Sequence, residues 1–201
     1  MSYLSVEDTF PLLNRIPEGD LIEFGVFSGN CLNRLIKGAE SAGKPFKGVV
    51  GFDSFIGIPK ETEGVLHNPE WPEGAFNVCK DFNLQSIEEG IEFVRGNVER
   101  KDIQLVPGYF EKSLTPILGD LLIDSTSYAH IDVDLYSSTI EVLDWIFTHR
   151  VLKVGAIIRY DDWMWCREGE AGNSLAHQQM VQKYGVQFNR LAYNVFQLMS
   201  Y

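Results

Sequence analysis

The chain has 201 residues, 45% hydrophobic and 22% charged, which is typical of one globular domain with a sizeable core, so we expect residues 1–201 to form a single domain. The formal net charge of −11 argues against nucleic acid or an anionic membrane as the main partner, because binding to either needs clustered Lys and Arg. The sequence contains no run of 18 apolar residues and no signal-peptide pattern, so we expect neither a membrane span nor secretion.

The first part of the chain alternates between two kinds of pattern, after a short helical pattern at residues 5–16 that Pro11 interrupts. Short apolar runs, typical of strands buried on both faces of a sheet, occupy residues 21–27, 49–52, 103–106, 129–133 and 156–158. Apolar residues at helical spacing fill residues 29–42, 86–94 and 138–147, the last with Ser137 or Ser138 as a suitable N-cap. This alternation predicts an α/β fold in which helices cover both faces of a doubly wound, mostly parallel sheet.

The end of the chain follows a different pattern. A helical stretch at residues 174–185 precedes two strand-like runs, 186–193 and 194–201, with little sequence between them. No helix fits between these runs, so we expect an antiparallel pair at the sheet edge. Residues 55–82 lack clear periodicity, and a loop of this length in a compact domain is usually a lid or a binding loop for the second substrate.

Acids and glycines gather where the predicted parallel strands end. Ligands of open parallel sheets bind at this carboxyl edge, near the point where the strand order reverses. The candidate residues, in chain order, are Glu23, Gly25, Gly29, Asp53, Gly108, Tyr109, Phe110, Asp132, Asp134, Asp161 and Asp162.

The first strand runs into a turn that carries Gly25 and Gly29. These glycines allow the backbone to approach a ligand closely, and the helix that follows points its N–H groups toward the same place. The spacing is G-x-x-x-G, which is not the dinucleotide pattern. Glu23 is unsuited to a phosphate and suits a cationic ligand. The alternative is that both glycines serve only tight packing.

The next two strand ends carry candidates for nucleoside binding. Asp53 is at the position where an acid typically accepts hydrogen bonds from both hydroxyls of a ribose. Its alternative role is to cap the following turn together with Ser54. Tyr109 and Phe110 could flank an adenine ring, or they could be a core aromatic pair after a turn.

Asp132, Asp161 and Asp162 give the strongest signal. Three carboxylates that converge from neighbouring strand ends would raise one another's pKa, and a hard divalent cation such as Mg²⁺ resolves this conflict. His130 shares a strand face with Asp132, where we expect a buried histidine that supports the site and is not a ligand. Asp134 lies one pleat farther out and is free to act as a general base.

These segments together resemble the macrocin O-methyltransferase (TylF-like) family. The matching segments are LIEFGVFSGN, GFDSFIGIP, GYFEKSL, HIDVDLYSST and YDDW, in the family's order. The resemblance implies a Rossmann-like class I methyltransferase fold with an antiparallel C-terminal strand. It also implies an O-methyltransferase that depends on S-adenosylmethionine (SAM) and Mg²⁺ and acts on a hydroxyl of a sugar or another small natural product. It leaves room for a homodimer.

The resemblance also implies roles for individual residues. The turn with Glu23, Gly25 and Gly29 would hold the methionine part of SAM, and Asp53 would bind its ribose. The expected cofactor site is completed by Ser54, Tyr109, Phe110 and Asp132. Asp132, Asp161 and Asp162 would hold the metal, and Asp134 would take the proton from the acceptor hydroxyl.

Several residues depart from the family pattern or extend it. Arg159 stands where small or β-branched residues are common; it could pair with a nearby acid or reach an anionic acceptor. Aromatic residues near the expected site suit either a sugar acceptor or packing in a lid or core: Trp71, Phe76, Trp163 and Trp165. Cys31, Cys79 and Cys166 are odd in number and form no C-x-x-C, so we expect reduced thiols in a cytoplasmic protein.

Three other functions fit parts of the pattern. A metal-dependent glycosyltransferase would also use a D-x-D strand end, but Glu23 is wrong for a diphosphate and basic residues are sparse. An aspartyl phosphatase would carry its D-x-D-x-x-x-T motif on the first strand of its domain, whereas the motif here follows the fourth. A non-catalytic binding module that keeps the fold is the remaining alternative.

Overall fold

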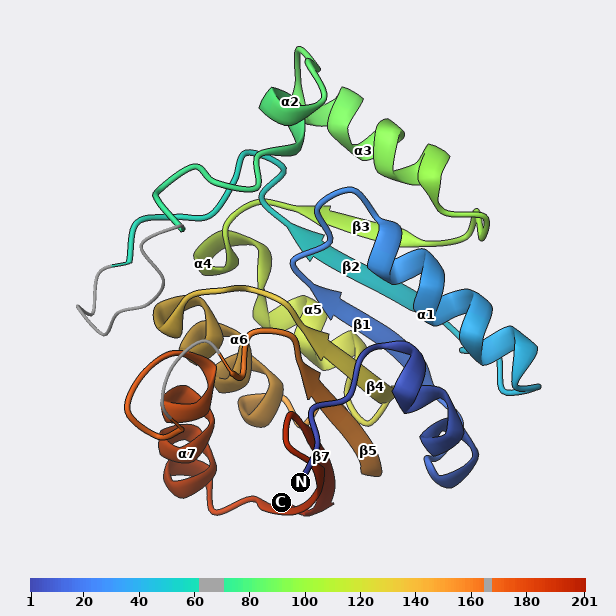
Figure 1. The fold of residues 1–201 in the computed structure, drawn as a ribbon, viewed down its shortest axis with the longest axis vertical. Helices are drawn as coiled ribbons and strands as arrows, with labels where there is room; N and C mark the ends of the chain where they lie inside the picture. The colour runs from blue at the N-terminus through green and yellow to red at the C-terminus, as the bar shows by residue number, and fades with distance from the viewer. Residues whose placement is uncertain (62–70, 165–167) are drawn as a thin grey trace.

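The computed structural model describes residues 1–61, 71–164 and 168–201 (Figure 1). Seven strands form one sheet: β1 (Asp20–Phe24), β2 (Val49–Asp53), β3 (Gln104–Pro107), β4 (Thr126–Ile131), β5 (Leu152–Tyr160), β6 (Gln187–Ala192) and β7 (Val195–Ser200). The helices are η1 (Glu7–Arg15), α1 (Asn30–Ser41), α2 (Val78–Asp81), α3 (Ile87–Asn97), α4 (Phe110–Ser113), α5 (Pro116–Leu121), α6 (Tyr136–Thr148) and α7 (Gly172–Tyr184).

The strands lie in the order β3-β2-β1-β4-β5-β7-β6. The first five in this order are parallel, whereas β7 is antiparallel to both β5 and β6. Both the parallel sheet and the antiparallel pair at its edge are therefore confirmed. The chain moves outward in one direction from β1 to β3 and in the other from β4 to β5, so the strand order reverses between β1 and β4. This reversal is where a ligand site is expected.

Helices cover both faces of the sheet and bury two apolar cores. On one face, Leu32, Leu35 and Ile36 of α1 pack with Leu13 of η1 and Val94 of α3. On the other face, the buried core includes five residues of α6 (Val142, Leu143, Trp145, Ile146 and Phe147) and Met180 of α7. Strands between two such layers are apolar on both sides, and this explains the uninterrupted apolar runs in the sequence. Figure 1 shows the two termini close together at the β7 side.

Several element boundaries differ from the predictions. The first strand ends at Phe24 and does not continue to Phe27, because Gly25 turns the chain with a φ of +82°. Helix α6 begins at Tyr136 after Leu135, with no side-chain cap, so the prediction of Ser137 or Ser138 as its N-cap is wrong. Ser138 is instead buried inside the helix.

Short helices account for most of the elements that the periodicity missed: α2, α4 and α5 have four to six residues each. The start of α5 nevertheless has a recognisable signal, since Thr115 caps it by accepting a hydrogen bond from the Leu118 N–H and Pro116 follows at the first helical position. The N-terminal helix is a 3₁₀-helix with Pro11 inside it. No helix within the described residues combines the length and the apolar character that a bilayer-spanning helix requires.

Candidate active site

The turn between β1 and α1 lies directly against the end of β4. Gly25 donates its N–H to the Phe52 carbonyl, and a Cβ added to Gly25 would lie 1.8 Å from the Asp132 carbonyl oxygen. Only glycine permits this approach, which brings the turn and Asp132 together at the strand-order reversal. Gly29 also has a positive φ, +79°, and is the N-cap of α1, but its added Cβ would meet Val94 of α3 at 2.9 Å. Gly29 therefore serves helix packing.

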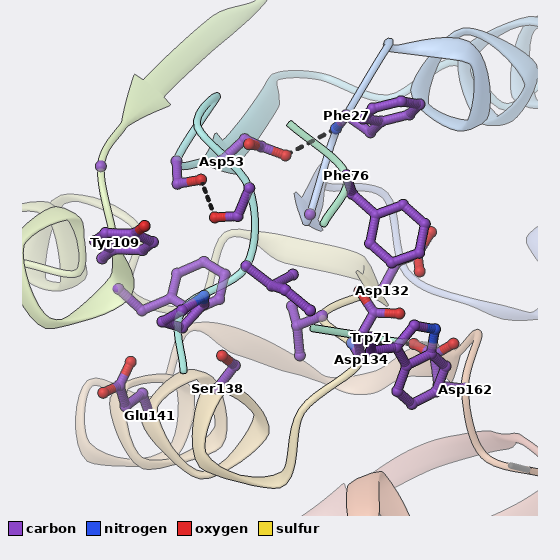
Figure 2. A pocket seen from close by; sticks show the side chains of 18 of the residues that line it. Phe27, Asp53, Trp71, Phe76, Tyr109, Asp132, Asp134, Ser138, Glu141 and Asp162 are labelled. Atoms are coloured by element: carbon purple, nitrogen blue, oxygen red, sulfur yellow. Dashed lines mark hydrogen bonds between the residues drawn. The ribbon is translucent and has the colours of Figure 1, made fainter. Parts of the chain in front are cut away.

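Asp53, at the end of β2, holds this turn in place. Its Oδ2 accepts hydrogen bonds from the Phe27 N–H (Figure 2) and the Val26 N–H, both at 2.8 Å, and its Oδ1 accepts one from the Phe55 N–H at 2.6 Å. Burial raises the pKa of Asp53, and these three backbone donors oppose that rise. The capping role considered from the sequence is thus present. Asp53 also lines the pocket described next.

A pocket of about 480 Å³ opens at the carboxyl edge of the sheet. Among the residues that the structure describes, seven acidic side chains line it: Asp53, Glu111, Asp132, Asp134, Glu141, Asp161 and Asp162. Figure 2 shows Asp132, Asp134 and Asp162 together on one side, with Ser138 and Glu141 of α6 farther away. Four of the aspartates that the sequence singled out, from the ends of β4 and β5, therefore share one cavity.

Crowding and burial change the acidity of these aspartates. Burial raises the pKa of Asp132 well above its usual range, and the charges of Asp162 and Asp161 raise it further. Burial likewise raises the pKa of Asp162, with added effects from Asp134 and Asp161. The pKa of Asp134 is raised to about 8, mainly by burial and next by the charge of Asp132. A cation bound beside Asp132, Asp134 and Asp162 would therefore favour their ionised forms.

The structure brings two of the three predicted metal ligands into one group of possible ligand atoms, and Asp162 lies outside that group. Oxygen atoms of Asp132 and Asp161 lie within 4.8 Å of each other and of a His130 ring nitrogen. Asp162 is turned so that its Oδ2 accepts a hydrogen bond from the Asp134 N–H at 3.1 Å, which leaves its other oxygen available. Carboxylate oxygens without a thiolate or a free imidazole favour Mg²⁺ or Mn²⁺ over zinc.

A buried line of polar side chains runs behind the acids, formed by Arg159, His130 and Glu23. Arg159 contacts the Nε2 of His130, whose Nδ1 lies 2.8 Å from the Glu23 Oε1. A guanidinium can only donate, so Nε2 must accept and Nδ1 must carry the hydrogen that Glu23 accepts. His130 is neutral, because burial and the charge of Arg159 lower its pKa well below the usual range. Both ring nitrogens are thus engaged, and His130 supports the site without a free lone pair for a metal.

Glu23 and Cys31 likewise do not form a metal site with His130. They lie close enough to His130 to form a second set of possible ligand atoms, with the Cys31 Sγ 3.5 Å from the His130 Nδ1. Nδ1 is protonated, so this set lacks the imidazole lone pair that a metal would need. Glu23 is fully buried and does not line the pocket, and its Oε2 has no hydrogen-bond partner. The sequence predicted that Glu23 belongs to the turn that holds the cofactor. In the structure it lies behind that turn and outside the pocket lining.

Aromatic side chains are part of the remaining lining. Tyr109 and Phe110 follow β3, as the sequence predicted, and Ser54 lies near them, where it donates a hydrogen bond to the Gly57 carbonyl at 2.7 Å. Trp71 and Phe76, from the predicted lid at residues 55–82, also line the pocket (Figure 2). The part of that lid at residues 62–70 lies outside the described residues.

Three lining residues adopt left-handed backbone conformations that side chains usually avoid. Phe27, Phe76 and Asp134 have φ values of +46°, +55° and +59°. Such conformations are rare in residues other than glycine and cluster at functional sites, where the surrounding structure holds them. The rings of Phe27 and Phe76 contact each other edge to face, with centroids 6.2 Å apart, so each stabilises the other's position.

Trp163 belongs to the core. It is 1% exposed and packs against Tyr160, Phe196 and His177, which agrees with the packing role that the sequence left open. Trp165 and Cys166 lie outside the described residues, and Cys31 and Cys79 are free thiols. Arg159 pairs with Asp161 at 2.8 Å and does not line the pocket.

Sequence reasoning missed several lining residues. Phe27, Ser138, Glu111 and Glu141 all line the pocket. Glu111 and Ser138 lie inside the segments GYFEKSL and HIDVDLYSST that had been singled out, so their position in those segments was the available signal. Phe27 had the same signal, because it lies inside the segment LIEFGVFSGN, whereas Glu141 lies outside every such segment.

A family model described as macrocin O-methyltransferase (TylF) matches residues 11–183. The chain belongs to this family. Its members are SAM-dependent O-methyltransferases. The glycosyltransferase and phosphatase alternatives are therefore dropped in favour of a methyltransferase. No sequence among curated proteins matches the chain.

Solved structures share the fold of this macrocin O-methyltransferase family member. The O-methyltransferase NovP is 24% identical, with a TM-score of 0.61 and coverage of 98% of this chain and 76% of NovP. The calicheamicin methyltransferase CalS11 is 20% identical, with a TM-score of 0.67 and coverage of 95% of this chain and 77% of CalS11. The SAH-bound methyltransferase PaMTH1 of Podospora anserina is 11% identical, with a TM-score of 0.52 and coverage of 98% and 76%. At these identities the likeness concerns the fold alone.

Proposed function

We propose that the protein transfers the methyl group of SAM to a hydroxyl of a sugar or another small natural product, with the help of Mg²⁺. The observation that carries this proposal is the gathering of Asp132, Asp134, Asp161 and Asp162 in one pocket beside the Gly25 turn. A methyl sulfonium already holds the reactive carbon, so the protein needs to supply only alignment and removal of a proton. The pocket contains residues suited to both tasks, alignment of the substrates and removal of the proton.

The cofactor would lie along the strand-order reversal. Gly25 would let it approach the backbone, Asp53 and Ser54 would bind the ribose, and Tyr109 and Phe110 would flank the adenine; all five residues line the pocket. Glu23 and Gly29 would act from behind the turn, Glu23 through its hydrogen bond with His130 and Gly29 through the packing of α1. Asp132 is central, because it lies between the turn and the other acids.

Asp132, Asp161 and Asp162 would hold the metal. When bound, Mg²⁺ orients neighbouring hydroxyls and lowers the pKa of one of them. Asp134 would accept the hydroxyl proton, and its raised pKa of about 8 makes its carboxylate a stronger base near neutral pH than an exposed aspartate. Its backbone N–H is fixed by Asp162, so the base is tied to the acids of β5.

The acceptor is best matched by a compound without phosphate. A structure of CalS11 is described as a TDP-rhamnose 3′-O-methyltransferase, so a nucleotide sugar is one acceptor class to consider. The described lining of this pocket holds seven acids and no Lys, Arg or His, which disfavours a diphosphate. Trp71 and Phe76 offer aromatic faces to a sugar ring or another planar group. We therefore favour an uncharged or cationic hydroxyl compound.

Ligand-induced stabilisation tests the proposal. SAM and S-adenosylhomocysteine (SAH) should raise the unfolding temperature, with about 2.7 kcal/mol of stabilisation at 100 times Kd. A UDP-sugar is the matched negative control. Methyl transfer from labelled SAM to a library of hydroxyl acceptors should then stop in EDTA and return with Mg²⁺. Full activity in EDTA would remove the metal role, and the absence of any response to SAM or SAH would leave a binding module as the better description.

A further inference from the structure

Arg159 places a positive charge directly behind the acid cluster. Its NH1 group donates to the Asp161 Oδ1 at 2.8 Å and to the His130 Nε2. Its NH2 group lies 3.1 Å from the Tyr3 hydroxyl oxygen, and its Nε donates to the Leu4 carbonyl at 3.2 Å. The guanidinium therefore has four fixed partners from three parts of the chain.

This charge is not neutralised by most of those partners. His130 and Tyr3 are uncharged, and Leu4 contributes a backbone carbonyl. The ion pair of Arg159 within the described part of the chain is with Asp161, and the Arg159 side chain is only 2% exposed. Water screens a buried charge less than an exposed one, so the guanidinium acts on the neighbouring carboxylates, although the Asp161 side chain is itself 41% exposed.

The carboxylate that Arg159 holds is one that the proposed metal would use. Asp161 and Asp132 have oxygens within 4.8 Å of each other and of a His130 ring nitrogen, and Arg159 contacts both Asp161 and His130. A divalent cation bound there would share Asp161 with the guanidinium and would be repelled by it. The contact has two opposite consequences: it fixes the position of Asp161, and it weakens the attraction of the cluster for a cation.

We propose that Arg159 is a resident counter-cation of this site, which positions Asp161 and lowers the affinity of the acid cluster for divalent metal. Arg159 is thus a positioning residue and touches neither donor nor acceptor. Without a metal, it stabilises the crowded carboxylates, so the cluster stays folded. The inference rests on the metal role in the proposed function and adds that this chain binds its metal more weakly than the acids alone would.

Metal binding, measured by isothermal titration with Mn²⁺ in the absence of acceptor, tests the inference independently of activity. Arg159→Met keeps the length of the side chain and removes its charge, and it should lower the Kd for Mn²⁺ at least tenfold. Arg159→Lys keeps the charge and should bind Mn²⁺ as the wild type does. Tyr3→Phe removes one contact of Arg159 without changing charge, and it should also leave the Kd within about threefold of the wild type.

The same substitution in a protein that lacks the Asp161 carboxylate separates the two roles of Arg159, the positioning of Asp161 and the repulsion of the metal. If it acts through Asp161, Arg159→Met should change the Kd much less in an Asp161→Asn protein than in the wild type. SAH-induced thermal stabilisation verifies that each variant is folded, and Arg159→Gln replaces Arg159→Met if the latter does not fold. Unchanged or weaker Mn²⁺ binding by the charge-removing variant would overturn the inference while leaving the metal role intact. Absence of Mn²⁺ binding in every variant, with SAH still bound, would instead refute the metal role itself.

Discussion

At the scale of single residues, the site depends on how burial and neighbours change ordinary side chains. Asp134 has a left-handed backbone, a hydrogen bond from its N–H to Asp162 and a pKa raised to about 8. None of these properties follows from its being an aspartate after a strand. Together they make it the strongest candidate for the base.

Replacing Asp134 with Asn tests that role. Asn also tolerates a positive φ, and its backbone N–H can still reach Asp162, so the fold of the loop should persist. We expect turnover to fall by about 10²–10⁴, the usual contribution of general acid–base catalysis, while SAH affinity stays nearly constant. Steady-state methyl transfer and SAH titration measure the two effects. Turnover equal to that of the wild type would assign the proton to another group.

The burial of His177 predicts how the free energy of unfolding depends on pH. It is buried against Trp163 and Phe196, its Nδ1 lies 2.9 Å from the Tyr160 hydroxyl, and burial lowers its pKa from 6.5 to about 3. The folded protein keeps His177 neutral below pH 6.5, whereas the unfolded chain binds a proton there. Stability is therefore complete above pH 6.5 and is lost as the pH falls, by up to about 1.4 kcal/mol for each pH unit.

Urea unfolding of the wild type and of His177→Gln from pH 7 to 4.5 checks this. Gln can accept the Tyr160 hydrogen but does not titrate, so the difference in unfolding free energy between the two proteins should shift in favour of the variant as the pH falls. A pH-independent difference would show that His177 is not held neutral.

At the scale of elements, the essential contact is between the β1–α1 turn and the end of β4. The Asp132 N–H binds the Phe24 carbonyl, and the Asp161 N–H binds the Ile131 carbonyl, so each acid is the first residue after its strand. The parallel register of β1, β4 and β5 thus brings acids from separate segments to one edge. A change in any one of these strand ends should affect the whole cluster.

Gly25→Ala tests this contact. The new Cβ would lie 1.8 Å from the Asp132 carbonyl oxygen at a φ of +82°, so the end of β4 must move. We expect a loss of at least about 2 kcal/mol in unfolding free energy and loss of SAH binding. The matched control is Gly96→Ala in α3, where no atom lies within 4 Å of the added Cβ, and it should be neutral or stabilise by about 0.5–1 kcal/mol. Chemical denaturation measures both, and a Gly25→Ala protein as stable as the control would contradict the contact.

At the scale of the whole molecule, the first residues of the chain and the last strands support the acid cluster from outside the pocket. Asn194, between β6 and β7, is fully buried and accepts a hydrogen bond from the Leu4 N–H at 2.9 Å. Its amide donates to the carbonyls of Leu4 and Tyr160 at 3.1 and 2.7 Å. Tyr3, next to Leu4, donates its hydroxyl to the Asp161 carbonyl. Segments about 190 residues apart in sequence therefore meet behind Asp161.

Asn194→Ala should weaken this junction. It removes three hydrogen bonds and leaves buried backbone groups of Leu4 and Tyr160 with fewer partners, so we expect a loss of about 2–4 kcal/mol in unfolding free energy. Metal affinity should also change, because the backbone at Tyr160, next to Asp161, loses the hydrogen bond that Asn194 donates. Thermal unfolding and Mn²⁺ titration measure the two effects. Asn14→Ala, at an exposed position in η1, is the control, and equal effects of the two substitutions would show that the junction contributes little.

The sequence by itself determined the α/β class, the parallel core, the antiparallel edge pair and the family. These depend on apolar periodicity and on contiguous motifs, which are local properties of the chain. It also identified the aspartates that line the pocket, because strand ends of a parallel sheet must meet at one edge.

Only the tertiary structure decided which side chains face the pocket and which support it from behind. Glu23 and Gly29 belong to the same motif as Gly25, yet Glu23 is bound to His130 and Gly29 packs on α3, while Gly25 lines the cavity. Arg159 had two possible partners from sequence, and folding paired it with Asp161. The physical reason is that a side chain's partner and its acidity depend on groups brought together from distant parts of the chain, and spacing along the sequence contains no record of them.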